Sequence, residues 1–110
     1  VRLENILFET NSATLLPESE KTLNEAGEAL AKYPSLRVEV GGHTDTRGAA
    51  APNQKLSQAR AETVREYLIS HFSLAADRLT AKGYGETQPI TQERNADELK
   101  QNRRVELIPR

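Results

Sequence analysis

A single arginine interrupts the apolar stripe of a helical segment in the middle of the chain. The segment runs from about residue 54 to about residue 70, and Arg60 lies one turn after Leu56 and one turn before Val64. Because a guanidinium holds a carboxylate by two parallel hydrogen bonds, an arginine that faces a core is suited to recognising an anion. The alternative is that its methylene groups lie along the core while the charged end reaches water.

Two further charged residues are candidates for the same region. Asp45 lies in the stretch GGHTDTRG, and Arg60 leans toward this loop because helical side chains point back toward the helix start. Period-2 alternation places Arg103 on the inward face of the last strand, with Val105 and Leu107. The alternatives are that Asp45 forms a turn with its own backbone and that Arg103 is solvated at the rim of the sheet.

The other residues that could do chemistry predict neither a metal site nor an enzyme. His43 and His71 are single, without a second His or Cys at ligand spacing. The stretch GHTDTRG lacks the Gly-Lys-Ser/Thr ending of a phosphate-binding loop. No nucleophile is paired with a base, and neither Ser12 nor Ser57 has a reason to be activated. We therefore expect no catalytic residues, no metal and no cofactor.

The composition narrows the class of protein further. The 110 residues suit one domain over 1–110, and the periodic apolar residues (36% of the chain) favour a fold over disorder. The net charge of −1 argues against nucleic-acid binding, because such proteins usually carry a basic excess. No apolar run is long enough for a membrane span, and no signal peptide is visible. We expect no membrane contact by this domain itself, with a targeting segment and a membrane anchor upstream.

The periodicity of apolar residues predicts seven elements. The alternation of Leu36, Val38 and Val40 with charged residues predicts a strand with one buried and one wet face, ended by Gly41-Gly42. Because such half-polar strands favour helices on one face only, we predict an α/β (α+β) two-layer sandwich with helices packed on one face of a mixed four-stranded sheet. In chain order we predict a strand at 6–8, a helix from 17 to 33, a strand at 36–40, a helix at 54–70, a strand at 79–84, a short helix at 95–101 and a strand at 103–108.

Two details concern the helices. Asn95 is predicted to cap the short helix, with Glu98 three residues later completing the capping pattern. In the long helix, Gln58 and Arg65 take the side opposite to the apolar stripe.

Four motifs together resemble a known family. GHTDTRG, NQKLSQARAETVREYL, GYGETQP and NRRVEL follow one another in the order seen in the OmpA-like peptidoglycan-binding domain. That domain occurs in outer-membrane protein A, peptidoglycan-associated lipoprotein and the flagellar stator protein MotB. The opening ILFETNSATLLPES is similar to the first strand and loop of the family, so the resemblance covers nearly all of the chain. The pattern N-x-x-L-S-x-x-R-A-x-x-V is met by Asn53, Leu56, Ser57, Arg60, Ala61 and Val64.

The resemblance implies non-covalent binding of peptidoglycan through the diaminopimelate residue of the stem peptide. This would anchor an outer-membrane or envelope protein to the wall, in the periplasm of a Gram-negative-type bacterium. The ligand-binding residues that the resemblance implies are Asp45, Arg60, Thr44, Asn53, Leu56 and Arg103.

Diaminopimelate carries an ammonium and a carboxylate on one carbon at its side-chain end. In the implied complex Asp45 takes the ammonium and Arg60 takes the carboxylate. The start of the second helix, expected around Lys55 and Leu56, would offer free backbone N–H groups to the same carboxylate. The alternative is a protein-interaction domain that keeps the fold without binding the wall.

Overall fold

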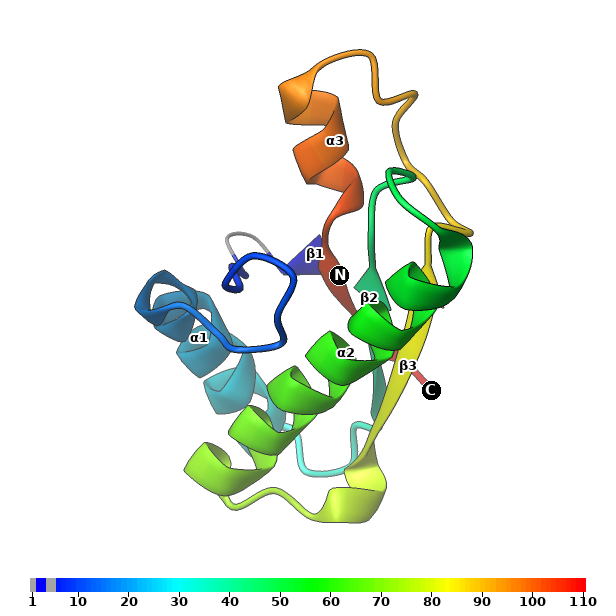
Figure 1. Ribbon diagram of the computed structural model, residues 1–110. Coiled ribbons are helices and arrows are strands. Elements are labelled where there is room, and N and C mark those ends of the chain that lie inside the picture. Colours follow the sequence, from blue (N-terminus) through cyan, green and yellow to red (C-terminus); the bar gives the residue numbers. More distant parts are fainter. Residues whose placement is uncertain (1, 4–5) are drawn as a thin grey trace.

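The computed structural model describes residues 2–3 and 6–110 (Figure 1). Within these residues, no helix combines the length and the apolar character needed to cross a membrane. The elements in chain order are β1 (Arg2–Leu3), the 3-10 turn η1 (Pro17–Ser19), α1 (Glu20–Lys32), β2 (Val38–His43), α2 (Ala50–Phe72), the 3-10 turn η2 (Ala76–Arg78), β3 (Leu79–Gly85), α3 (Ala96–Asn102) and β4 (Val105–Pro109).

The strands form a mixed sheet in the order β1-β4-β2-β3. β2 and β3 are parallel and are joined through α2, whereas β4 lies antiparallel on the other side of β2. β1 adds only two paired residues at the outer edge of β4. The predicted mixed α+β architecture is confirmed, and the body of the sheet consists of β3, β2 and β4, with β1 as a short edge segment.

The first strand was predicted at the wrong place. Residues 6–8 lie outside the sheet, and Phe8 makes only an isolated bridge with Leu15. The reason is a competing local partner: the backbone N–H of Leu7 donates to Oγ of Ser19 at 2.7 Å, and this hydroxyl donates back to the Leu7 carbonyl at 2.9 Å. Ser19 is fully buried, so the segment folds onto the start of α1 and leaves the edge of β4 to β1.

The helices α1 and α2 bury the core with one face of the sheet. α2 lies across β2 and β3, and α1 packs beside α2 (Figure 1). α3 stands beyond the end of the sheet, so the prediction that all helices cover one face was wrong for this helix. The buried apolar cluster is Leu3, Ile6, Leu23, Leu30, Val38, Val40, Ala61, Val64, Leu68, Leu74, Leu79 and Val105.

The pair Gly41-Gly42 continues β2 instead of ending it. A Cβ atom at Gly42 would lie 2.4 Å from the backbone oxygen of Ser57, and one at Gly83 would lie 2.3 Å from the backbone nitrogen of Gln58. Both separations are shorter than any stable contact, so glycine at these two positions lets α2 lie directly on the sheet. This close approach brings the first half of α2 next to the end of β2.

Side chains of α2 also close the free edge of β3. Gln58 donates to the carbonyl of Ala81 at 3.1 Å and accepts from the N–H of Gly83 at 2.7 Å. Nε of Arg65 donates to the carbonyl of Leu79 at 2.7 Å. Gln58 and Arg65 therefore do not point to the far side of the helix, as predicted, but replace a neighbouring strand. An edge whose backbone groups are bonded in this way offers little template for pairing with another chain.

Candidate functional site

The six residues named from the sequence pattern line one cleft of about 830 Å³. The walls come from the end of β2 and the loop after it, the first half of α2, part of α3, the start of β4 and residues between 6 and 11. The six residues named from the sequence are Thr44, Asp45, Asn53, Leu56, Arg60 and Arg103.

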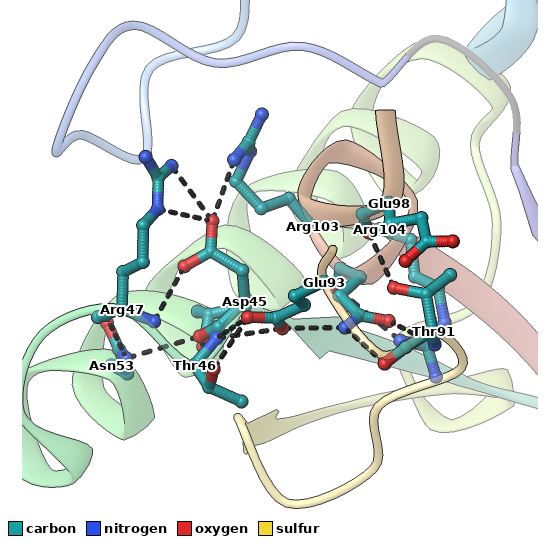
Figure 2. Close-up of polar contacts among 11 residues, drawn as sticks. Asp45, Thr46, Arg47, Asn53, Thr91, Glu93, Glu98, Arg103 and Arg104 are labelled. Atoms are coloured by element: carbon teal, nitrogen blue, oxygen red, sulfur yellow. Dashed lines mark hydrogen bonds and ion pairs between the residues drawn. The ribbon is translucent and has the colours of Figure 1, made fainter. Parts of the chain in front are cut away.

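Asp45 is the buried anion of the cleft lining, beside the exposed Asp97 of α3. It lies just beyond the end of β2, with 5% of its surface exposed. Nη1 of Arg103 donates to its Oδ2 at 2.7 Å. Arg47 donates to the same oxygen from Nη2 at 3.0 Å and from Nε at 3.3 Å, as Figure 2 shows. Burial opposes the charged form, but the bonds from Arg47 and Arg103 outweigh it and hold the pKa of Asp45 below its ordinary value.

Asp45 also shapes its own loop, which was the alternative interpretation from the sequence. Its Oδ1 accepts the backbone N–H of Arg47 at 3.0 Å, two residues on. The amide of Asn53 donates to the carbonyl of Arg47 at 2.9 Å, and Oγ1 of Thr44 donates to the Asp45 carbonyl at 2.9 Å. Asn53 and Thr44 therefore brace the turn that carries Asp45, while the carboxylate itself faces the cleft.

Arg60 is the cation that α2 contributes to the cleft, and it is half-buried. Its Nε donates to the carbonyl of Ser12 at 2.8 Å, and its guanidinium carbon lies 4.7 Å from the centre of the Phe8 ring. Burial lowers the pKa of Arg60, and the nearby cation of Arg103 lowers it further. Among residues 2–3 and 6–110, no carboxylate forms an ion pair with this guanidinium. Arg60 is thus a half-buried cation whose partners among the described residues are neutral: two backbone carbonyls and one aromatic ring.

The helix start lies elsewhere than predicted. α2 begins at Ala50, so the N–H groups of Lys55 and Leu56 are inside the helix and bonded to it. Pro52 is tolerated because it falls in the first turn, where a backbone N–H has no partner within the helix. Leu56 instead contributes an apolar side chain to the wall of the cleft.

A metal site was not predicted, and within the described part of the chain no group of three or more His, Asp or Glu side chains could hold a metal ion. The ring of His71 contacts the carbonyl of Tyr67 at 3.0 Å, and the ring of His43 stacks on Tyr84 at 5.0 Å.

Comparison of this sequence with models of known protein families identifies the family of the chain. The family model described as OmpA family matches residues 7–103. The chain belongs to the OmpA family.

Three relatives of this OmpA-family chain are informative. It is 33% identical over 103 residues to the peptidoglycan-binding protein ArfA of Mycobacterium bovis, covering 94% of this chain and 31% of ArfA. The structure of the cell wall anchor of the T6SS from Pseudomonas aeruginosa superposes with a TM-score of 0.81 at 36% identity, covering 94% of this chain and 76% of that one. The peptidoglycan-associated lipoprotein from Burkholderia pseudomallei gives a TM-score of 0.84 at 27% identity, covering 96% and 88%. The chain spans less than half the length of the curated relatives that it matches.

Two residues that bond directly to the loop carrying Asp45 were missed from the sequence, and of these Arg47 lines the cleft whereas Glu93 does not. Arg47 pairs with Asp45, and the spacing of two residues is the only signal that could have indicated it. The carboxylate of Glu93 accepts from both the backbone N–H and the hydroxyl of Thr46 (Figure 2), at 3.0 and 2.6 Å. Glu93 is 47 residues away in the chain, and no sequence pattern connects it with this loop.

Proposed function

We propose that this chain binds peptidoglycan non-covalently and so anchors an envelope protein to the cell wall. The observation that carries the proposal is the half-buried guanidinium of Arg60, which shares a cleft with Asp45 and has only neutral partners among the described residues. A buried cation without an anion is costly, so a ligand carboxylate would satisfy it. Relatives named as a peptidoglycan-binding protein and a cell wall anchor support the same function.

The ligand group that fits this pair of charges is the free amino acid centre of diaminopimelate. Asp45 would accept from its ammonium, and Arg60 would donate to its carboxylate. Arg103 would hold Asp45 in place from β4, and Leu56 would contact the methylene chain of the ligand. Thr44 and Asn53 would act through the loop that they brace.

The size of these interactions favours selectivity over tight binding. Each charge-assisted hydrogen bond contributes about 1.5–3 kcal/mol net. Association itself costs roughly 4–15 kcal/mol in lost freedom. We therefore expect micromolar to sub-millimolar affinity for one stem peptide, and much stronger retention on an intact wall with many sites.

The cellular setting follows from the same hypothesis. We place the chain in the periplasm, as one domain of 110 residues within a larger outer-membrane or envelope-associated protein. Relatives named as an outer membrane porin and as a lipoprotein support an envelope location. The proposed role is that of a binding module without catalytic activity.

Calorimetric titration with meso-diaminopimelate tests this assignment. Arg60→Ala and Asp45→Asn are expected to lose at least about tenfold in affinity, because each removes one charge-assisted contact. Arg37→Ala is the matched control, since Arg37 is exposed and pairs with Asp77 instead of lining the cleft. Equal binding by the parent and both cleft variants would refute these roles.

Retention on purified cell-wall sacculi separates the wall-binding proposal from the alternative. A parent protein that is retained, with an Arg60→Ala variant that is not, supports wall binding through this cleft. A parent protein that is not retained at all would favour a protein-interaction domain that keeps the fold without wall binding.

A further inference from the structure

The carboxylate of Glu93 connects two segments that meet at the cleft. Its Oε1 accepts from the hydroxyl of Thr46 at 2.6 Å, and its Oε2 accepts from the Thr46 backbone N–H at 3.0 Å. The same Oε2 accepts from the side-chain amide of Asn102 at 2.6 Å. Glu93 therefore joins the loop after β2 to the last residue of α3.

These contacts close a ring around the charged pair of the cleft. Thr46 directly follows Asp45, and Asn102 directly precedes Arg103. Nη1 of Arg103 returns to Oδ2 of Asp45 at 2.7 Å (Figure 2). The ring thus consists of two peptide bonds, the hydrogen bonds of Glu93 and one ion pair. The backbones of β2 and β4 are already joined by the bond from the His43 N–H to the Arg104 carbonyl at 2.9 Å, so Glu93 fixes the loop beyond this point, where Asp45 and Thr46 lie.

Asn102 is a fixed support for this ring. It is fully buried, and its Oδ1 accepts from the backbone N–H groups of Ile90 at 2.7 Å and of Thr91 at 3.0 Å. Its amide nitrogen must then face Glu93. In the opposite orientation of the amide, the NH2 group of Asn102 would face the backbone N–H groups of Ile90 and Thr91, which are donors as well. Leaving the buried amide of Asn102 without a hydrogen-bond partner would cost more free energy than the bond itself contributes, so this amide keeps Glu93 in place.

The backbone at Glu93 gives independent evidence that this position is imposed by its contacts. Its φ angle is +58°, in the left-handed region that a glutamate rarely adopts. Such a conformation costs about 1 kcal/mol or more and persists only where the surrounding structure holds it. Burial raises the pKa of Glu93, but the bonds from Thr46 and Asn102 outweigh it and lower that pKa overall, so the side chain is an acceptor at neutral pH.

We infer that Glu93 is a positioning residue for ligand binding, which acts through Thr46 and Asn102 to hold Asp45 against Arg103. The inference rests on the proposed function, because it assigns Glu93 to the same cleft. Without the Glu93 carboxylate, the loop at Thr46 is no longer tied to Asn102, so Asp45 moves away from Arg103 and keeps Arg47 as its main partner. The pairing of β2 with β4 persists, because the backbone N–H of His43 still donates to the Arg104 carbonyl at 2.9 Å. A ligand ammonium then meets an aspartate that is no longer aimed into the cleft.

The test exchanges the carboxylate of Glu93 and the side-chain amide of Asn102 between the two positions. In Glu93→Gln, either orientation of the new amide turns its NH2 group toward a donor: the NH2 group of Asn102 in one orientation and the backbone N–H of Thr46 in the other. In Glu93→Gln/Asn102→Asp, the amide of residue 93 donates to the carboxylate of residue 102, which still accepts from two backbone N–H groups and loses only the long contact with the Thr91 carbonyl at 3.3 Å. We expect Glu93→Gln to weaken meso-diaminopimelate binding by about 5- to 20-fold and the double variant to return to within about threefold of the parent.

A second readout follows Asp45 itself in the ligand-free protein. Titration of its carboxyl carbon by NMR is expected to show a higher pKa in Glu93→Gln, because Arg103 has moved away, and a parent-like pKa in the double variant. Glu62→Gln, at an exposed position of α2, is the matched control and should change neither quantity.

The outcomes separate this inference from the proposed function. If the parent binds diaminopimelate and Glu93→Gln binds equally well, only the role of Glu93 is overturned. The same conclusion follows if the double variant does not recover, because Glu93 would then act through general stability. If the parent does not bind diaminopimelate, the proposed function fails and the positioning role fails with it.

Discussion

Arg47 and Asp45 form an ion pair at the mouth of the cleft, with Nη2 of Arg47 3.0 Å from Oδ2 of Asp45. The side chain of Arg47 is 65% exposed, whereas that of Asp45 is 7% exposed. Because Oδ2 also accepts from Arg103, this oxygen has no lone pair left for a ligand ammonium. In the proposed complex the ligand ammonium would compete with Arg47 for this oxygen, because Arg47 is the more exposed of its two partners.

Removing the Arg47 side chain should strengthen ligand binding. Because Arg47 is exposed and water screens its charge, its competition is weak, and Arg47→Ala is expected to raise the affinity for meso-diaminopimelate by about 1.5- to 5-fold. Calorimetric titration at low ionic strength measures this, with Arg37→Ala as the control for the loss of one positive charge. Weaker binding by Arg47→Ala would mean that Arg47 contacts the ligand instead of competing with it.

The proposed role of Arg60 predicts a preference between wall types. A stem peptide with lysine in place of diaminopimelate lacks the second carboxylate, which leaves Arg60 unpaired and costs about 1–3 kcal/mol, or roughly 5- to 150-fold in affinity. The comparison needs stem tetrapeptides, because free lysine carries its own zwitterionic centre. In Arg60→Ala this preference should shrink to less than about twofold. Equal binding of both peptides by the parent would exclude Arg60 as the carboxylate partner.

The two neighbouring glycines of β2 should differ in their tolerance of a methyl group. A Cβ at Gly42 meets the backbone oxygen of Ser57 at 2.4 Å, whereas a Cβ at Gly41 meets the ring of Tyr84 at 3.2 Å on the opposite face. We expect Gly42→Ala to lower the free energy of unfolding by about 2–3 kcal/mol, because α2 must move off the sheet. Gly41→Ala should cost less than about 1 kcal/mol, since a side-chain ring adjusts more easily than a backbone. Urea unfolding measures both, and equal losses would contradict the close packing of α2.

The buried ring of His43 predicts that stability depends on pH. Its side chain is 2% exposed, and neither ring nitrogen has a hydrogen-bond partner among the described residues. Burial lowers the pKa of His43 to about 4, helped by the cation of Arg104 and opposed by Glu106 and Glu39. Because the unfolded chain binds a proton at higher pH, the stability from neutral His43 is complete above the ordinary value of 6.5 and is lost as pH falls toward 4.

The expected loss between pH 7 and pH 5 is about 2 kcal/mol in the free energy of unfolding. Urea denaturation at both pH values measures it. His43→Phe keeps the contact with Tyr84 but cannot take up a proton, so most of the slope should disappear in this variant. A slope that survives unchanged would assign the pH dependence to other groups.

Local sequence patterns predicted much of the fold because each depends on few neighbours. The alternation of apolar and charged residues located β2 and β4, although both faces of β2 are buried. For the two arginines before β4 the alternation was wrong about burial, because Arg103 is exposed and Arg104 is buried, yet Arg103 does reach Asp45. Helical spacing located α1 and α2, and Asn95 caps α3 by accepting the N–H of Glu98 at 2.9 Å, as predicted. Each of these signals lies within one element or one turn, so the chain itself contains the information.

Errors occurred where a distant segment competes for the same groups. The backbone at Leu7 bonds to Ser19 instead of joining the sheet, and Gly42 continues a strand because α2 lies on it. Gln58 was placed on the far side of α2 by its angular position relative to the apolar stripe, yet the free edge of β3 gives it two backbone partners. Polarity predicts that a side chain needs partners, but only the packed structure decides whether water or another strand supplies them.

The sequence by itself indicated three charges that the structure brings to one cleft: Asp45 in the loop after β2, Arg60 within an apolar helical stripe, and Arg103 just before the last strand. Only the tertiary structure decided how these charges are balanced. The carboxylate of Asp45 accepts hydrogen bonds from the guanidinium groups of Arg47 and Arg103. Arg60 does not bond to this carboxylate and donates to the carbonyl of Ser12 instead. The reason is that periodicity is a property of one helix or strand, whereas the pairing of charges depends on distances between segments that are far apart in the sequence.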